Sequence, residues 1–258
     1  MNFGQTILLG AIAGLTIYLG LPIGRIKEMS EKTRSFLSMT SAGILLFLFI
    51  DIFRQLSQPI QSALQAAEYP QFTFLLLIMI LGFAAGLFGL IGFERGFFRF
   101  RSARDQAISP VRLALMIATG IGLHNFSEGL AIGQSAGRGE IVFATILIVG
   151  FALHNATEGF GIMGPLVGAE RPSWTFLGLV GLIGGGPTFL GTMVGYYFVS
   201  SSMSVLFLSL AAGALVYIIG ELFHVNRRPG TKFSAGLGFF IGFLFAYLTD
   251  LILVAAGV

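Results

Sequence analysis

The chain has 258 residues, of which 55% are hydrophobic and only 10% are charged. Soluble domains carry roughly a quarter of charged residues, so this composition indicates a protein that is surrounded by lipid. The formal net charge of +3 is too small to suggest binding to nucleic acid. Cysteine is absent from the sequence, which excludes disulfides and thiolate metal sites and leaves imidazole, carboxylate and amide groups as metal ligands.

Apolar stretches of membrane-spanning length fill most of the chain. A helix needs about 20 apolar residues to cross the hydrocarbon core of a bilayer. The sequence therefore predicts an all-α, polytopic membrane protein with eight transmembrane helices in a single domain, residues 1–258. The predicted spans are 4–23, 36–53, 72–92, 113–135, 141–165, 174–198, 203–223 and 233–256.

Basic residues are concentrated in alternate loops. Only two of the fifteen, Arg54 and Arg138, fall in the loops after even-numbered spans. The other thirteen fall in the loops after odd-numbered spans: Arg25, Lys27, Lys32, Arg34, Arg95, Arg99, Arg101, Arg104, Arg112, Arg171, Arg227, Arg228 and Lys232. Because loops rich in Lys and Arg stay in the cytoplasm, we expect a multi-pass protein of the cell membrane with both termini outside.

Several ionisable residues fall inside the predicted spans or at their ends. The set comprises Asp51, His124, Glu128, His154, Glu158, Glu221, His224 and Asp250. A carboxylate at the centre of a membrane helix costs about 2.5–3.5 kcal/mol on the insertion scale. Such residues therefore usually line a polar path or bind a ligand, and each of them is a candidate for a functional role.

Two polar motifs are near copies of each other, thirty residues apart. Residues 123–129 read LHNFSEG and residues 153–159 read LHNATEG. In each motif, His and Glu are four positions apart and share one helix face, and the Asn after the His points to nearly the same side. Both histidines fall near the middle of their spans, and the two spans run antiparallel. We therefore expect His124, Glu128, His154 and Glu158 to meet at the bilayer midplane.

Two imidazoles and two carboxylates would suit a borderline-soft divalent cation such as zinc, iron(II), manganese or cobalt. The sequence cannot choose among these metals. A single buried His–Glu pair would equally suit interhelical hydrogen bonding or a proton relay, but two matched pairs at one depth favour a metal. We therefore predict transport of a divalent transition metal cation, zinc before the others, toward the cytoplasm through this midplane His/Glu site. The alternative is translocation of protons or other ions by the His–Glu pairs without metal.

Other functional classes find less support. The HExxH signature of membrane metalloproteases and a GxxxxGK[ST] nucleotide loop are both absent from the sequence. Three histidines are also too few for a His-rich di-iron oxidase. We expect neither enzymatic activity nor a prosthetic group, with the metal as the transported ligand. A metal sensor that does not transport remains a third reading, which flux measurements would separate.

At the two motifs the sequence resembles the ZIP (Zrt/Irt-like protein) family of divalent-metal transporters. That family typically carries HNxPEG in its fourth helix and a similar motif in its fifth, where this chain has HNFSEG and HNATEG. The resemblance implies eight spans and a primary metal shell of His124, Glu128, His154 and Glu158. It places Asn125 and Asn155 at a second metal position, and it suggests a homodimer.

The chain departs from the family pattern at several positions. Ser127 and Thr157 replace the proline before each Glu, and Asn155 stands where an acidic residue is common. Gly186–Pro187 corresponds to a Glu–Pro site in some relatives. The last two departures remove negative charge from the second metal position, so we expect one strong metal site and a weak or absent second one.

Four further residues are candidates for a transport pathway. Asp51 and Asp250 lie near the predicted outer ends of spans two and eight, where a carboxylate would attract cations by focusing the local field. Glu221 and His224 lie near the predicted inner end of span seven, three positions apart, and would receive the metal as it leaves. The alternative reading for Asp51 and Asp250 is a polar residue at the membrane interface, and for His224 a place in the basic cytoplasmic loop.

Overall fold

The computed structural model describes residues 1–26, 30–97, 109–168, 171–198, 200–226 and 230–255. Over these ranges the chain forms α-helices and short 3-10 helices and no strand, which confirms the all-α prediction there. The elements in chain order are α1 (Phe3–Leu15), η1 (Thr16–Leu19), η2 (Leu21–Arg25), α2 (Glu31–Gln65), α3 (Tyr69–Phe97), α4 (Pro110–Gly137), α5 (Ile141–Met163), η3 (Gly164–Leu166), α6 (Trp174–Tyr197), α7 (Ser201–Val225) and α8 (Lys232–Ala255).

Most of these helices are long and apolar enough to cross a membrane. Within the described ranges, seven helical segments meet that criterion: Phe3–Arg25, Glu31–Gln65, Tyr69–Gly92, Ile141–Leu166, Trp174–Tyr197, Ser201–His224 and Lys232–Leu251. Helix α4 is not among them, because His124, Asn125 and Glu128 fall within its central turns and lower its hydropathy. The chain is therefore a helical membrane protein, and an eighth span stays a prediction.

Helix α2 is much longer than the predicted span 36–53. It runs for 35 residues from Glu31 to Gln65, about 52 Å at 1.5 Å per residue, and includes Pro59. Arg54, which the sequence placed in a loop, therefore lies inside a helix. Asp51 likewise lies in the interior of α2. Its place near the outer end of the membrane span stays a prediction.

The first predicted span is also interrupted. Helix α1 ends at Leu15, and the chain continues through η1 and η2 to Arg25. At Gly20, between the two 3-10 helices, an added Cβ would overlap the backbone of Ala156 and Phe160 in α5. Glycine at this position lets the broken segment lie directly on α5.

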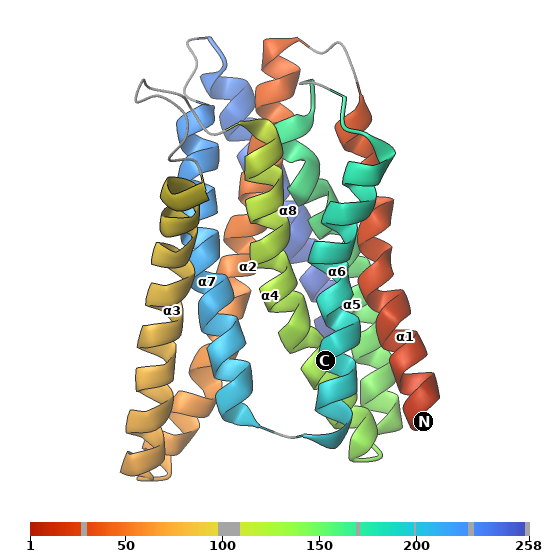
Figure 1. Cartoon of the computed structure of the whole chain (residues 1–258), viewed down its shortest axis with the longest axis vertical. Helices are drawn as coiled ribbons and strands as arrows, with labels where there is room; N and C mark the ends of the chain where they lie inside the picture. Colours follow the sequence, from red (N-terminus) through yellow and green to blue (C-terminus); the bar gives the residue numbers. More distant parts are fainter. Residues whose placement is uncertain (27–29, 98–108, 169–170, 199, 227–229, 256–258) are drawn as a thin grey trace.

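The helices pack in closely apposed pairs, with α4 along α6, α2 along α8 and α3 along α7 (Figure 1). A Cβ on Gly129 of α4 would overlap the Thr188 carbonyl oxygen of α6, and one on Gly191 would overlap that of Phe126. Small residues at helix contacts let backbones approach closely, and in lipid such packing replaces the hydrophobic effect as the force that joins helices. Glycines approach backbone carbonyls in the α2–α8 and α3–α7 pairs as well, so all three pairs pack in the same way.

Helix α4 occupies the centre of the bundle, between α3 and α7 on one side and α1, α5 and α6 on the other (Figure 1). Its buried side chains extend from Leu113 to Ala136 and include the polar residues of the first motif. The outer surface carries large exposed apolar side chains such as Leu81, Leu182 and Phe240. This polar-inside, apolar-outside arrangement suits a protein solvated by lipid.

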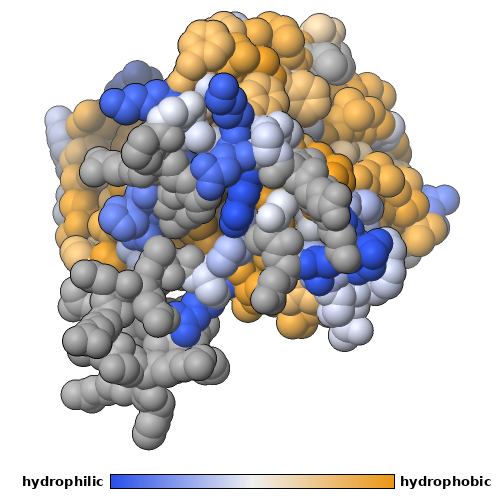
Figure 2. Space-filling model, turned by 90° about the horizontal axis from the view of Figure 1, so that it is seen from above, coloured by the Kyte–Doolittle hydropathy of each residue, from blue (hydrophilic) through white to orange (hydrophobic). Residues whose placement is uncertain are grey.

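The helices alternate in direction. The α2–α3 and α4–α5 connections lie at the same end of the bundle as the N-terminus (Figure 1). At the opposite end lie Lys32, Arg112 and Lys232, at the starts of α2, α4 and α8. Viewed from that end, hydrophilic residues form a band across the middle of the face, and apolar residues lie above it and to its right (Figure 2). For the described residues at these helix starts, the alternation of basic residues in the sequence thus places them at one end of the bundle.

Candidate functional site

The two sequence motifs lie side by side on α4 and α5, deep inside the bundle. His124 is 1% exposed, Glu128 is 4% exposed, and Asn125, Asn155 and Glu158 are fully buried. Both carboxylates are therefore almost completely shielded from the molecular surface. Such burial is costly for charged groups unless other polar groups or a cation compensate them.

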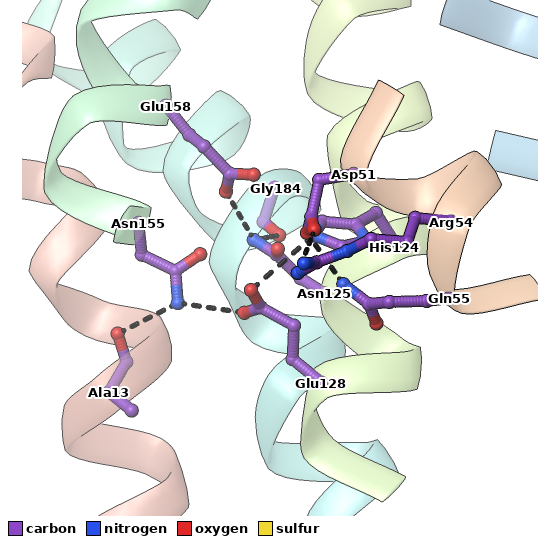
Figure 3. A network of polar contacts seen from close by, with 10 residues as sticks. All are labelled: Ala13, Asp51, Arg54, Gln55, His124, Asn125, Glu128, Asn155, Glu158 and Gly184. Carbon is purple, nitrogen blue, oxygen red and sulfur yellow. Dashed lines mark hydrogen bonds and ion pairs between the residues drawn. The ribbon is translucent and has the colours of Figure 1, made fainter. Parts of the chain in front are cut away.

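The motifs are joined by reciprocal contacts between Asn and Glu. Asn125 Nδ2 donates to Glu158 Oε2 at 3.0 Å, and Asn155 Nδ2 donates to Glu128 Oε2 at 3.5 Å (Figure 3). Each amide therefore contacts the carboxylate of the other motif, not its own. The near-repeat in sequence corresponds to a near-symmetric arrangement in space.

Two backbone carbonyls extend this network to neighbouring helices. Asn125 Nδ2 also donates to the Gly184 carbonyl oxygen of α6 at 3.0 Å. Asn155 Nδ2 also donates to the Ala13 carbonyl oxygen of α1 at 3.1 Å. An amide nitrogen has two hydrogens, so both donors of each Asn are engaged, and this fixes which way its oxygen faces.

The oxygens of these two amides have no such partners. Asn125 Oδ1 and Asn155 Oδ1 are buried and accept no hydrogen bond from any residue that the structure describes. Buried polar atoms in folded proteins are nearly always satisfied by protein, water or an ion. Two oriented amide oxygens beside two carboxylates form an electron-rich centre, which a cation or a hydrogen-bond donor such as water could satisfy.

His124 belongs to the same centre. Its Nε2 lies 3.4 Å from Glu128 Oε1, one helical turn away. Imidazole nitrogen and carboxylate oxygen are thus adjacent, as the four-residue spacing predicts. A group of three or more His, Cys, Asp or Glu side chains close enough to hold one metal ion was not found within the described ranges. The side chain of His154 lies outside the residues that the structure describes.

Asp51 of α2 carries its own polar partners. Its Oδ1 is 3.0 Å from Arg54 Nη2, and its Oδ2 accepts a hydrogen bond of 2.6 Å from Gln55 Nε2 (Figure 3). The carboxylate also interacts electrostatically with His124. Asp51 therefore borders the central site.

The remaining pathway candidates lie elsewhere. Glu221 is partly exposed and His224 is exposed, both in the last turns of α7, and Asp250 is partly exposed in α8. The network drawn in Figure 3 includes none of the three. Their role in a pathway stays a prediction.

Sequence reasoning missed several members of the site. Arg54 and Gln55 follow Asp51 by three and four positions, so helical spacing was a signal for both once the helix was known to continue. The carbonyls of Ala13 and Gly184 had no signal, because any residue supplies a carbonyl and only the packing of α1 and α6 places these two. Thr188 of α6 is fully buried as well, and its hydroxyl oxygen has no hydrogen-bond partner in the described part of the chain.

The fold and the site define a polytopic helical membrane protein whose interior holds a compact group of amide, carboxylate and imidazole side chains. No family model matches the chain. The chain is 29% identical over 262 residues to "Zinc transporter ZupT" of Streptococcus mutans serotype c, an alignment that spans 96% of this chain and 97% of that protein. The similarity thus extends over nearly the full length of both sequences.

Proposed function

We propose that the protein transports a divalent transition metal cation, zinc in the first instance, across the cell membrane toward the cytoplasm. The observation that carries the proposal is the pair of buried contacts in which the Asn of each motif donates to the Glu of the other motif, between α4 and α5. The side-chain oxygens of both Asn residues lack a hydrogen-bond donor among the described residues. The full-length similarity to a zinc transporter supports it. Together with the two motifs, this similarity supports membership of the ZIP family.

The primary ligands in this proposal are His124, Glu128 and Glu158, with His154 added from the sequence repeat. Nitrogen and oxygen donors of this kind suit zinc and its neighbours in the first transition series. The two carboxylates offset the charge of a cation that sheds water on entering the site. Binding must be tight enough to select the ion and loose enough to release it.

The amide oxygens of Asn125 and Asn155 would be additional ligands. A second metal beside the first would find little negative charge on α6. Gly186 and Pro187 supply no charged side chain there, and they line an apolar groove of about 390 Å³ between α1 and α6. We therefore propose one strong metal site and at most a weak second one.

Helix α4 is proposed as the eighth span. It has 28 residues, which corresponds to about 42 Å and is long enough to cross the hydrocarbon core. Its neighbours in sequence, α3 and α5, both have membrane-spanning segments. Polar side chains in such a helix are tolerated when they face the interior of the bundle, and His124, Asn125 and Glu128 are buried there. Eight spans and the basic residues at one end support termini on the outer side.

In this orientation the cation approaches from the end where the chain begins and passes Asp51 before reaching the site. It leaves toward Glu221 and His224, at the end where the basic residues gather. Asp250 is proposed as a second carboxylate that raises the local cation concentration. None of these steps requires hydrolysis of a nucleotide.

The test is zinc flux into liposomes that contain the purified protein and an internal zinc-sensitive dye. We expect saturable zinc uptake by the wild-type protein and its loss in a His124→Ala plus His154→Ala double variant, because both imidazole ligands are removed. Cobalt, manganese, iron(II) and cadmium in the same assay establish the metal preference.

A proton assay separates the alternative function. A pH-sensitive dye in the same liposomes reports proton flux with a metal chelator on both sides of the membrane. Proton flux that persists under chelation, without zinc uptake, would replace the proposal with ion translocation by the His–Glu pairs. Zinc binding without flux of either ion would identify a sensor.

A further inference from the structure

The positively charged side chain of Arg54 forms an ion pair with Asp51, the carboxylate that borders the site. Arg54 Nη2 lies 3.0 Å from Asp51 Oδ1, and the two residues are three positions apart on α2. The side chain of Asp51 is 12% exposed, whereas that of Arg54 is 60% exposed. The carboxylate of Asp51 therefore faces the interior of the bundle, and the guanidinium of Arg54 faces its surface.

Gln55 holds the same carboxylate from another side. Its Nε2 donates to Asp51 Oδ2 at 2.6 Å, so the two oxygens of Asp51 have different partners. This hydrogen bond does not involve Arg54, so it would hold the carboxylate in place if the guanidinium moved away. Because Arg54 is largely exposed, its long, flexible side chain has room to move away from Asp51 toward the surface.

Asp51 is also close enough to His124 to interact with it electrostatically (Figure 3). A cation that moves between the surface and the His124–Glu128 pair therefore passes the field of Asp51. The guanidinium is charged at every physiological pH, so it competes for this carboxylate under all conditions.

We propose that Arg54 is a tethered competitor for the entering cation: a divalent ion must displace it from Asp51, and Arg54 thereby sets the apparent affinity for cation entry. This inference rests on the proposed transport function and adds to it a residue that tunes the affinity. The divalent ion displaces Arg54 because it carries twice the charge of the guanidinium and because an ion pair whose cation is largely exposed is weak.

The experiment measures the concentration dependence of zinc flux into liposomes for Arg54→Gln, Asp51→Asn and the double variant of the full chain. Arg138→Gln serves as the matched control, because Arg138 is an exposed basic residue at the C-terminal end of α4, outside the site. We expect Arg54→Gln to lower KM roughly two- to fivefold, the range of an exposed ion pair, with kcat within roughly twofold of wild type. Arg138→Gln should leave both constants near wild type.

The double variant tests whether Arg54 acts through Asp51. Asp51→Asn should raise KM, and adding Arg54→Gln to it should lower KM no further, because the competition no longer exists. An unchanged or raised KM in Arg54→Gln, or an equal decrease of KM in the Asp51→Asn background, would overturn the inference.

Calorimetric titration of the detergent-purified proteins with zinc separates this inference from the proposed function. Absence of flux in the wild type would count against transport alone, since Arg54→Gln should still tighten the zinc Kd roughly two- to fivefold. An unaltered Kd together with an unaltered KM would reject the role of Arg54 while leaving transport intact.

Discussion

Glu158→Gln should abolish zinc transport and weaken zinc binding at least about 100-fold. Loss of a residue that merely supports a metal ligand already costs about 10–100-fold in affinity, and Glu158 is proposed as a ligand itself. The glutamine retains an oxygen that can accept from Asn125 Nδ2, which donates to Glu158 at 3.0 Å in the wild type. The variant therefore removes the negative charge and preserves the contact between α4 and α5.

Thermal unfolding distinguishes loss of the ligand from loss of the fold. Zinc at about 100 times its Kd should stabilise the wild-type protein by about 2.7 kcal/mol, and this gain should vanish in Glu158→Gln. Without metal, the two proteins should unfold at similar temperatures. Glu140→Gln is the matched control, because Glu140 is exposed just before α5 and its side chain does not cap that helix. A zinc Kd in Glu158→Gln within about threefold of wild type would remove Glu158 from the metal shell.

The central part of the site was predictable because it depends on local spacing. His and Glu four positions apart must share a helix face, and the repeat thirty residues later places a matching face on the next helix. His124 and Glu128 are indeed adjacent in the structure. Asn125 and Asn155 were singled out for their positions, and the structure adds that each amide crosses to the other motif. Spacing along one helix cannot reveal such a crossed contact, because it depends on how α4 and α5 are rotated.

The extent of α2 was less predictable for a physical reason. Asp51 and Arg54 read as the polar end of a span, because charged residues usually mark the point where a helix leaves the hydrocarbon. In the structure the two charges neutralise each other within one turn, and the helix continues past Pro59 to Gln65. An ion pair inside a helix thus looks like a helix end when residues are counted one at a time.

The role of α6 had no sequence signal in its side chains. Helix α6 contributes the Gly184 carbonyl that accepts from Asn125 Nδ2, and its backbone lies directly against α4. The glycines of both helices are common to membrane proteins, so composition alone assigns them only to ordinary packing. These glycines matter for the site because one of them, Gly129, directly follows Glu128 and lies against the backbone of α6.

Gly129→Ala should disrupt both the fold and the site. A Cβ at Gly129 would overlap the Thr188 carbonyl oxygen, and a backbone atom cannot rotate away as a flexible side chain would. Helices α4 and α6 must then separate, which typically costs about 1–3 kcal/mol in a well-packed interior. The separation also lengthens the hydrogen bond of 3.0 Å from Asn125 Nδ2 to the Gly184 carbonyl oxygen. We expect a lower unfolding temperature together with weaker zinc binding.

Gly178→Ala on α6 provides the matched control for this substitution. A Cβ at Gly178 would meet no atom within 4 Å, so the added methyl group enters open space. Alanine favours a helix by roughly 1 kcal/mol over glycine, and Gly178→Ala should therefore be neutral or slightly stabilising, with unchanged zinc binding. The difference between the two variants isolates the contact of α4 with α6 from the helix propensity of alanine. Equal unfolding temperatures for Gly129→Ala and Gly178→Ala would show that the two helices adjust without strain, and that their close approach does not hold the site together.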